Sequence, residues 1–337
     1  LEGSGGKAFC AGGDVKGIAI AGKEPPPAGD EPPITDAFFR EEYALNAAIG
    51  GSPKPQVSVW DGIVMGGGVG LSVHGKYRVC TEKAMFAMPE TNIGLFPDVG
   101  GSHFLASLPG ELGTYIGLSG ARLHAADLLH AGLATHFVPS SALPELAPAL
   151  SSCTSAADVD GVLTKLSQPV DALPADAKPP TLAPNREAID AAFGYDSIEE
   201  ILSALERMSA SSTAGDDGKA AFAAATLSTL SKMSPTSLKL TLRLLREARQ
   251  GQGVDAPLTR CLEREFRVVQ RCVTPGKQLG SDDFFEGIRA ALIDKDRKPV
   301  WSPSEPQGVG AADVDAYFEG LGDKELKIVP GNGFVEP

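Results

Sequence analysis

The pattern of apolar and polar positions predicts strands early in the chain and helices after them. Residues 57–64 and 77–81 are rich in β-branched and aromatic residues, and each run is followed by glycine or a charged turn, as strands commonly are. Apolar positions at helical spacing predict helices over residues 101–108, 125–130 and 198–208.

A serine–proline pair predicts the start of a further helix. Ser234 is a good capping residue, and Pro235 fits the first helical position, where a missing N–H does no harm. Leu238, Leu242 and Leu245 then fall on one face of that helix. We expect these leucines to belong to the core or to an interface, not to a binding site.

Three segments rich in proline, alanine, serine or glycine predict loops or linkers. They are residues 22–33, 168–186 and 209–218, and no internal repeat accompanies them. The last two bracket a short stretch with helical spacing, so we expect a helical insert between them.

Two glycine clusters, at residues 7–14 and 64–71, each lead from an apolar run into a helix start. Glycine lets the backbone approach a ligand closely, and N–H groups at a helix N-terminus favour a phosphate or the oxyanion of acyl transfer. Tight turns and close packing are the alternative explanation of such glycines. Neither nucleotide motif fits, because Leu71 replaces the third glycine of a dinucleotide fingerprint and Ala8 follows Gly6-Lys7, where a phosphate loop needs serine or threonine.

Two carboxylates, Glu90 and Asp98, flank the apolar residues Leu95, Phe96 and Pro97. An apolar wall disfavours the charged form of a carboxyl group, so either acid could exchange protons near neutral pH. A pair of acids in different surroundings can divide the roles of acid and base. The alternative is that both are solvated surface charges, which is the usual state of acidic residues.

Composition and the remaining chemistry-bearing residues exclude several functions. The 337 residues carry a net charge of −13, which argues against a nucleic-acid surface, and no apolar run is long enough to span a membrane. The histidine spacings are not those of a metal site. The five cysteines include no Cys-x-x-Cys pair and predict free thiols, and Cys10 is expected to be a small buried residue, not a nucleophile.

The motifs resemble those of a known superfamily. Residues 5–14 and 65–75 resemble the two oxyanion-hole motifs of the crotonase (enoyl-CoA hydratase/isomerase) superfamily. More narrowly, residues 39–43, 88–91 and 94–101 resemble the members that hydrolyse 3-hydroxyisobutyryl-CoA in valine breakdown. The likeness continues through residues 134–138, 232–239, 286–295 and Trp301.

The resemblance implies an α/β fold, a crotonase-like spiral of β-β-α units followed by a helical C-terminal region. The implied domains are a core over residues 1–150 that lacks the opening unit of its relatives, a divergent helical or linker insert over 151–220, and C-terminal helices over 221–337. In relatives such helices pack over the active site and mediate self-association.

The resemblance also assigns roles to five residues. The backbone N–H groups of Gly13 and Gly67 would form an oxyanion hole for the thioester carbonyl. Glu90 would act at the acyl carbon as a nucleophile or as a general base on water, and Asp98 would assist proton transfer or orient the water. Glu42 would contact the hydroxyl end of the acyl group.

The implied activity is thioester hydrolysis without a metal and without a cofactor beyond the CoA of the substrate. Enoyl-CoA hydratases have a second glutamate where this chain has Gly70, so hydration is the disfavoured alternative. Another alternative is a structural subunit of a mitochondrial small ribosomal subunit, against which the acidic balance argues. Lys16, Lys54 and Arg78 are candidate contacts for the CoA phosphates, and a mitochondrial location is implied by the family alone.

Overall fold

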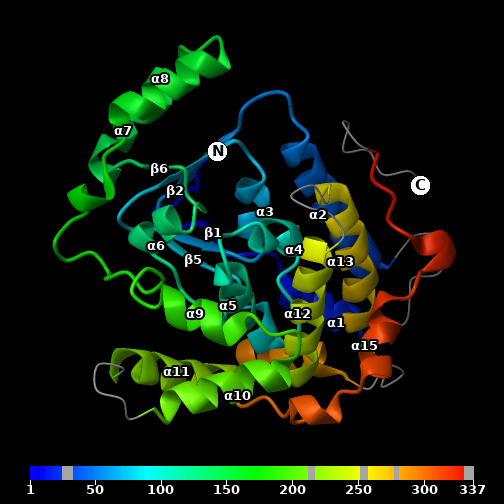
Figure 1. The fold of residues 1–337 in the computed structure, drawn as a ribbon. Helices are drawn as coiled ribbons and strands as arrows, with labels where there is room; N and C mark the ends of the chain where they lie inside the picture. The colour runs from blue at the N-terminus through cyan, green and yellow to red at the C-terminus, as the bar shows by residue number, and fades with distance from the viewer. Residues whose placement is uncertain (25–32, 212–216, 251–256, 277–280, 330–337) are drawn as a thin grey trace.

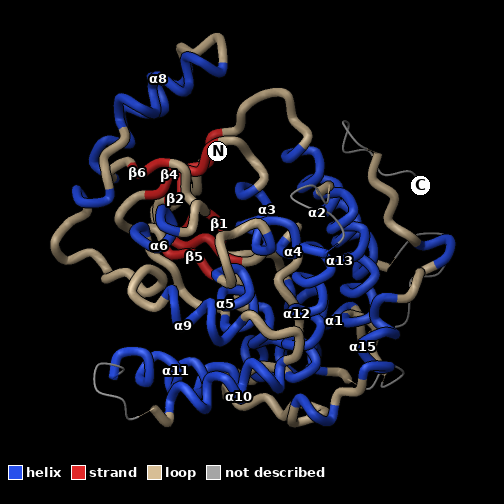
Figure 2. The backbone as a smooth tube through the Cα atoms, in the orientation of Figure 1, coloured by secondary structure: helices blue, strands red, loops and turns tan. Residues whose placement is uncertain are grey.

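The computed structural model describes residues 1–24, 33–211, 217–250, 257–276 and 281–329. Short strands occupy the centre of the molecule and helices surround them (Figure 2). The strands are β1 (Ala8–Cys10), β2 (Val57–Trp60), β3 (Ile63–Met65), β4 (Tyr77–Cys80), β5 (Met85–Ala87) and β6 (His136–Phe137).

Helices alternate with the strands as far as β6, and the chain after β6 is helical. In the first half they are α1 (Val15–Ala21), α2 (Ile34–Gly50), α3 (Gly67–Val73), the 3₁₀ turn η1 (Glu90–Ile93), α4 (Gly101–Ala106), α5 (Leu112–Ser119), α6 (Ala125–His130), α7 (Leu143–Ser151) and α8 (Ala156–Leu166). In the second half they are α9 (Arg186–Phe193), α10 (Ile198–Ser209), α11 (Asp217–Leu230), α12 (Pro235–Gln250), α13 (Leu258–Cys272), α14 (Asp283–Ile288) and α15 (Ala311–Phe318).

The strands form two parallel sheets of three strands each. One sheet has the order β1-β3-β5 and the other β2-β4-β6, so consecutive strands alternate between the two sheets. The chain therefore winds as a spiral in which a pair of strands, one per sheet, precedes each helical return, as in β2-β3-α3. This confirms the predicted spiral of β-β-α units and the α/β class.

The prediction of one strand over residues 57–64 is wrong. The run divides into β2 and β3, which lie in different sheets and are separated by Asp61 and Gly62. Gly62 has a φ of +109°, and a Cβ there would overlap the carbonyl oxygen of Lys7, so the turn needs glycine. An Asp-Gly pair inside an apolar run was the available signal of this turn.

The other predicted elements agree closely with the structure. Residues 77–81 contain β4, and the predicted helices 101–108, 125–130 and 198–208 correspond to α4, α6 and α10. Helix α12 begins at Pro235, and Ser234 caps it by accepting a 3.0 Å hydrogen bond from the N–H of Ser237.

The predicted leucine stripe lies in the core. Leu238, Leu242 and Leu245 are each at most 3% exposed. The segment 168–186 holds only a 3₁₀ turn at 170–172 before α9 begins, as predicted for a loop. Within the other two predicted loops, residues 25–32 and 212–216 lie outside the described residues.

One large hydrophobic core joins the strands to the C-terminal helices. It runs from Phe9 in β1 to Phe266 in α13, and α13 packs along α2 while α12 packs against α4 and α5. A smaller cluster holds α7 and α8 against β2 and β4, and these two helices project from the body in Figure 1. The domain boundaries at 150 and 220 stay predictions.

No helix in the described ranges combines the length and apolarity needed to cross a bilayer.

Candidate active site

The two predicted oxyanion glycines lie side by side at one sheet edge. Gly13 follows β1 and Gly67 follows β3, and these strands pair in parallel, so their carboxyl ends meet. A Cβ built on Gly67 would lie 3.4 Å from the nitrogen of Gly13. Neither N–H donates to any group in the described part of the chain, and Gly67 is the first residue of α3, at the positive end of its dipole. Two free donors therefore lie close together.

The structure brings the three predicted acids to the same place. Glu42, Glu90 and Asp98 line a cavity of about 120 Å³ together with both glycines. They come from α2, from η1 and from the turn before α4. Glu42 and Asp98, which are 56 positions apart in sequence, thus share one cavity with the two glycines.

Glu90 is held by packing of the C-terminal helices on its turn. It is the first residue of η1, which contacts α12 and α14, and the N–H of Ser234 donates to the Thr91 carbonyl at 3.0 Å. Its side chain is 5% exposed, and Oε2 has no hydrogen-bond partner among the described residues. Burial, followed by the charges of Asp98 and Glu42, raises the pKa of Glu90 well above its ordinary value.

Asp98 lies in a different environment from Glu90. It is 5% exposed, but its Oδ2 accepts a 2.8 Å hydrogen bond from the Tyr43 hydroxyl. Burial raises the pKa of Asp98 to about 6, against the opposing hydrogen bond from Tyr43. Asp98 is therefore more readily ionised than the other two acids of the cavity.

Glu42 projects from the middle of α2 toward the oxyanion glycines. A Cβ on Gly67 would overlap its Oε1, so the carboxyl group lies directly over the α3 N-terminus. Burial, and then the charge of Asp98, raises the pKa of Glu42 to about 8. At neutral pH Glu42 is thus mainly protonated and able to donate a hydrogen bond.

We predict that Glu42→Gln raises stability at alkaline pH. Glu42 has a pKa of about 8 in the folded protein against an ordinary 4.5, so the folded state binds more protons between these values. Stability is therefore lost as pH rises from about 4.5 to about 8, and an uncharged glutamine avoids this loss. Urea unfolding should show a higher midpoint than the parent at pH 8 and a similar one at pH 4. The exposed neighbour Glu41 provides the control, Glu41→Gln, and a lower midpoint for Glu42→Gln at pH 8 would contradict the prediction.

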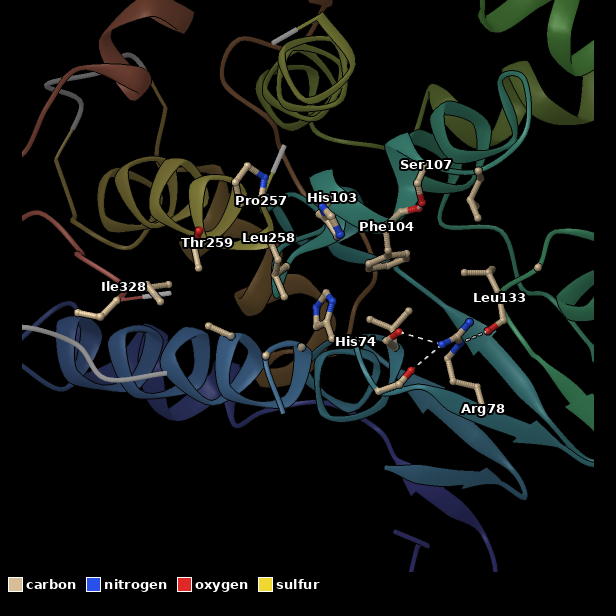
Figure 3. Close-up of a pocket in the computed structure, with 18 residues that line it drawn as sticks. His74, Arg78, His103, Phe104, Ser107, Leu133, Pro257, Leu258, Thr259 and Ile328 are labelled. Atoms are coloured by element: carbon tan, nitrogen blue, oxygen red, sulfur yellow. Dashed lines mark hydrogen bonds between the residues drawn. The ribbon is translucent and has the colours of Figure 1, made fainter. Parts of the chain in front are cut away.

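The predicted CoA contacts do not gather at this cavity. Lys16 and Lys54 are exposed and do not line it, although Lys16 follows the lining residue Val15, and Arg78 lines a separate cavity of about 430 Å³ (Figure 3). There Arg78 donates to the carbonyl oxygens at positions 73, 75 and 133, so it caps the C-terminal end of α3. The larger cavity contains none of the three acids.

Other predictions concerned cysteine and metal chemistry. All five cysteines are free, and Cys10 is half-buried in β1. Within the ranges that the structure describes, no group of three or more His, Cys, Asp or Glu side chains is arranged to hold a metal ion.

Three residues around Asp98 were not predicted from the sequence. Tyr43 ends the motif 39–43 but received no role, although its hydroxyl contacts Asp98. Glu265 and His74 contact the backbone of the turn that follows Asp98. Glu265 could have been noticed from the sequence, because helical spacing puts it on the apolar face of α13 beside Leu262. In the structure it is fully buried there.

Comparison with known proteins gives concordant results. A family model described as enoyl-CoA hydratase/isomerase matches residues 1–318. The chain is 45% identical over 328 residues to the mitochondrial 3-hydroxyisobutyryl-CoA hydrolase of Xenopus laevis, covering 97% of this chain and 78% of that protein. The human protein of the same name is 42% identical over 328 residues, with 97% and 78% covered. A solved enoyl-CoA hydratase from Rhodobacter sphaeroides 2.4.1 superposes with a TM-score of 0.76 at 37% identity, covering 97% of this chain and 85% of that one.

Proposed function

This chain belongs to the enoyl-CoA hydratase/isomerase family, and on that premise we propose that it hydrolyses the thioester of 3-hydroxyisobutyryl-CoA to 3-hydroxyisobutyrate and CoA, a step of valine breakdown. Relatives that are 42% and 45% identical over most of the chain are named for this hydrolysis. The observation that carries the proposal is the meeting of three carboxyl groups, of which Glu90 and Asp98 are buried, with two free N–H donors in one cavity.

The oxyanion donors would act on the thioester carbonyl. Attack on the acyl carbon builds negative charge on the carbonyl oxygen, and the N–H groups of Gly13 and Gly67 would donate hydrogen bonds to that oxygen. Such a donor is commonly worth about 3 kcal/mol in the transition state. A thiolate leaves readily, so the site needs no strong acid at the sulfur.

Glu90 would supply the attacking group. It either adds to the acyl carbon, giving an anhydride that water then cleaves, or removes a proton from water as the water adds. Both routes need the ionised carboxylate, and a raised pKa makes that carboxylate a stronger base and nucleophile. Asp98, which ionises most readily, would receive or relay the proton of the water. Protonated Glu42 would donate to the hydroxyl oxygen of the acyl group.

We expect the rate to depend on pH in a way that reports these raised pKa values. Since the attacking carboxylate must be ionised, kcat/KM should fall as pH decreases. The midpoint of this fall should lie at or above about pH 6, where the pKa of Asp98 lies, and not near 4 as for solvated carboxylates. A pH series of initial rates measures it, and a flat profile between pH 5 and 8 would exclude a buried carboxylate in the rate-limiting step.

Gly70 separates hydrolysis from hydration. A Cβ on this residue of α3 would lie 2.7 Å from Cβ of Val99 and 2.8 Å from Nδ2 of Asn46, so no second glutamate fits there. We predict that Gly70→Ala lowers the free energy of unfolding by about 1–3 kcal/mol through overpacking. Urea unfolding measures this, and the control is Gly161→Ala in α8, where a Cβ meets nothing within 4 Å. Equal stability of the two variants would show that the space is not limiting.

The test of function is release of free CoA, read with a thiol reagent, from 3-hydroxyisobutyryl-CoA beside acetyl-CoA and crotonyl-CoA. We expect release confined to the hydroxyacyl substrate. Hydration of crotonyl-CoA would favour a hydratase instead. A folded protein inactive on all three, and co-sedimenting with mitochondrial ribosomes in salt, would favour the structural role.

The proposal includes a cellular location and binding partners. We place the protein in mitochondria, because the relatives from Xenopus laevis and Homo sapiens are named mitochondrial. The acyl-CoA substrate would be its small-molecule partner, with no cofactor beyond the CoA itself. Self-association through the C-terminal helices is the expected oligomeric contact.

A further inference from the structure

The turn that carries Asp98 holds its backbone in a strained conformation. Val99 has a φ of +53° and is completely buried, and Gly100 follows with a φ of +81°. A positive φ is rare for any residue with a side chain and rarer still for a β-branched one, because the branched Cβ crowds the backbone. Such strain persists only where the surroundings hold it.

Glu265 holds the turn from the side of α13. Its Oε2 accepts from the N–H of Gly100 at 2.8 Å, and its Oε1 accepts from the N–H of Ser102 at 2.8 Å and from the Ser102 hydroxyl at 2.6 Å. These N–H groups begin α4, so a carboxylate from a helix about 165 residues away caps it. The glutamate is fully buried, and burial raises its pKa, but each of its oxygens accepts from a backbone N–H, an arrangement that favours the charged form.

His74 holds the same turn from the side of α3. Its Nε2 lies 2.7 Å from the carbonyl oxygen of Val99, which can only accept, so Nε2 carries the proton and donates. Burial lowers the pKa of His74 to about 4, so the ring stays neutral at physiological pH. The ring packs against Phe104 and lines the 430 Å³ cavity, which is separate from the cavity of the acids (Figure 3).

Two forces act to move Asp98 away from its position. The strain at Val99 is relieved if the turn relaxes, and burial disfavours the charged form of Asp98, which would be better hydrated if it turned toward solvent. The Tyr43 hydroxyl is the one side-chain hydrogen-bond partner of the Asp98 carboxylate in the described part of the chain. The backbone contacts of Glu265 and His74 therefore oppose both forces.

We propose that Glu265 and His74 are positioning residues, which fix the Asp98–Ser102 turn in its strained form so that the Asp98 carboxylate stays among the acids of the cavity. The inference rests on the proposed function for the role of Asp98, but the geometry it concerns can be measured without turnover. Neither residue touches the cavity that the acids line.

The main test is Glu265→Gln, which keeps the size of the side chain but turns one acceptor into a donor facing an N–H. We expect kcat to fall about 10- to 100-fold with KM changed less than about threefold, because a small misplacement of a reacting group has effects of this order. The matched control is Asp127→Asn. Asp127 is another buried carboxylate that accepts backbone N–H groups, those of Thr181 and Leu182, and it lies outside the acid cavity. This control should lower stability and leave kcat unchanged.

A second readout does not need activity. In the parent protein the carboxyl carbon of Asp98, followed by NMR during a pH titration, should report a pKa of about 6. In Glu265→Gln and in His74→Phe, which keeps a ring against Phe104, we expect this pKa to move down toward the ordinary value as Asp98 turns toward solvent. If the parent protein fails to release CoA, the proposed function fails, yet this titration still tests the positioning.

Rescue separates positioning from general destabilisation. Adding Val99→Gly to Glu265→Gln removes the strain, since glycine adopts a φ of +53° freely, so kcat should recover at least about threefold although a buried side chain is lost. The proposal is overturned if Glu265→Gln only lowers stability, as Asp127→Asn does, and leaves both kcat and the Asp98 titration unchanged. It is equally overturned if Val99→Gly lowers kcat further in the Glu265→Gln background.

Discussion

Glu90→Gln is expected to reduce CoA release from 3-hydroxyisobutyryl-CoA by about a thousandfold or more in kcat. The amide has the same size as the carboxyl group but neither attacks an acyl carbon nor takes a proton from water, so both routes through Glu90 are blocked. KM should change little, because the N–H donors and the rest of the cavity remain. Steady-state rates with a thiol reagent measure the effect.

The same substitution should not harm the fold. Glu90 is buried with an unpartnered oxygen and is disfavoured as a charge by burial, Asp98 and Glu42, so a neutral amide relieves repulsion. We therefore expect an unchanged or higher urea midpoint at pH 8 for Glu90→Gln, and parental kcat for the control Glu41→Gln. Retention of more than about a tenth of the activity by Glu90→Gln would remove Glu90 from the reaction and leave Asp98 as the remaining candidate.

Gly67→Ala is expected to lower kcat by about 10²- to 10³-fold by filling the oxyanion hole. Gly67 has ordinary helical geometry, so alanine is not excluded by its backbone. Its methyl group would instead overlap Oε1 of Glu42 and lie 3.4 Å from the nitrogen of Gly13, in the space that the carbonyl oxygen must enter.

A second glycine provides the comparison. A Cβ on Gly218, near the start of α11, would meet nothing within 4 Å, so Gly218→Ala should keep full activity and equal or greater stability. Parallel kinetics and urea unfolding of the two variants measure both effects. If Gly67→Ala remained as active as Gly218→Ala, the carbonyl oxygen would have to bind elsewhere.

The sequence allowed prediction of the parts of the site that lie in short motifs. Glycine pairs after apolar runs indicated the turns at Gly13 and Gly67, and both follow strands and precede helices in the structure. The apolar residues between Glu90 and Asp98 indicated raised pKa values, and the structure gives that direction for both acids. Local patterns sufficed here because each feature depends on neighbours within about ten positions. Glu42, by contrast, was a candidate through the family resemblance alone.

The contacts around Asp98 could not be predicted in this way. Glu265 reaches Gly100 across 165 positions, and only the packing of α13 on α4 brings them together. Periodicity shows that position 265 faces inward but not which element it meets. The division of residues 57–64 between two sheets could not be predicted for a related reason. Strand propensity at Val57 and Ile63 is the same whichever sheet each strand joins.

The proposed oxyanion hole would be a product of strand pairing and not of loop conformation. Its two donors follow β1 and β3, whose parallel register sets their separation once the core has formed. The three acids, in contrast, come from a helix, a 3₁₀ turn and a strained turn, which lie outside that strand pair. If these donors act on a carbonyl as proposed, its activation would persist while the side chains around it change, so new reactions on this scaffold would need only substitutions that leave the sheets intact. The superposition of this chain on a protein named for hydration is consistent with such an evolutionary route.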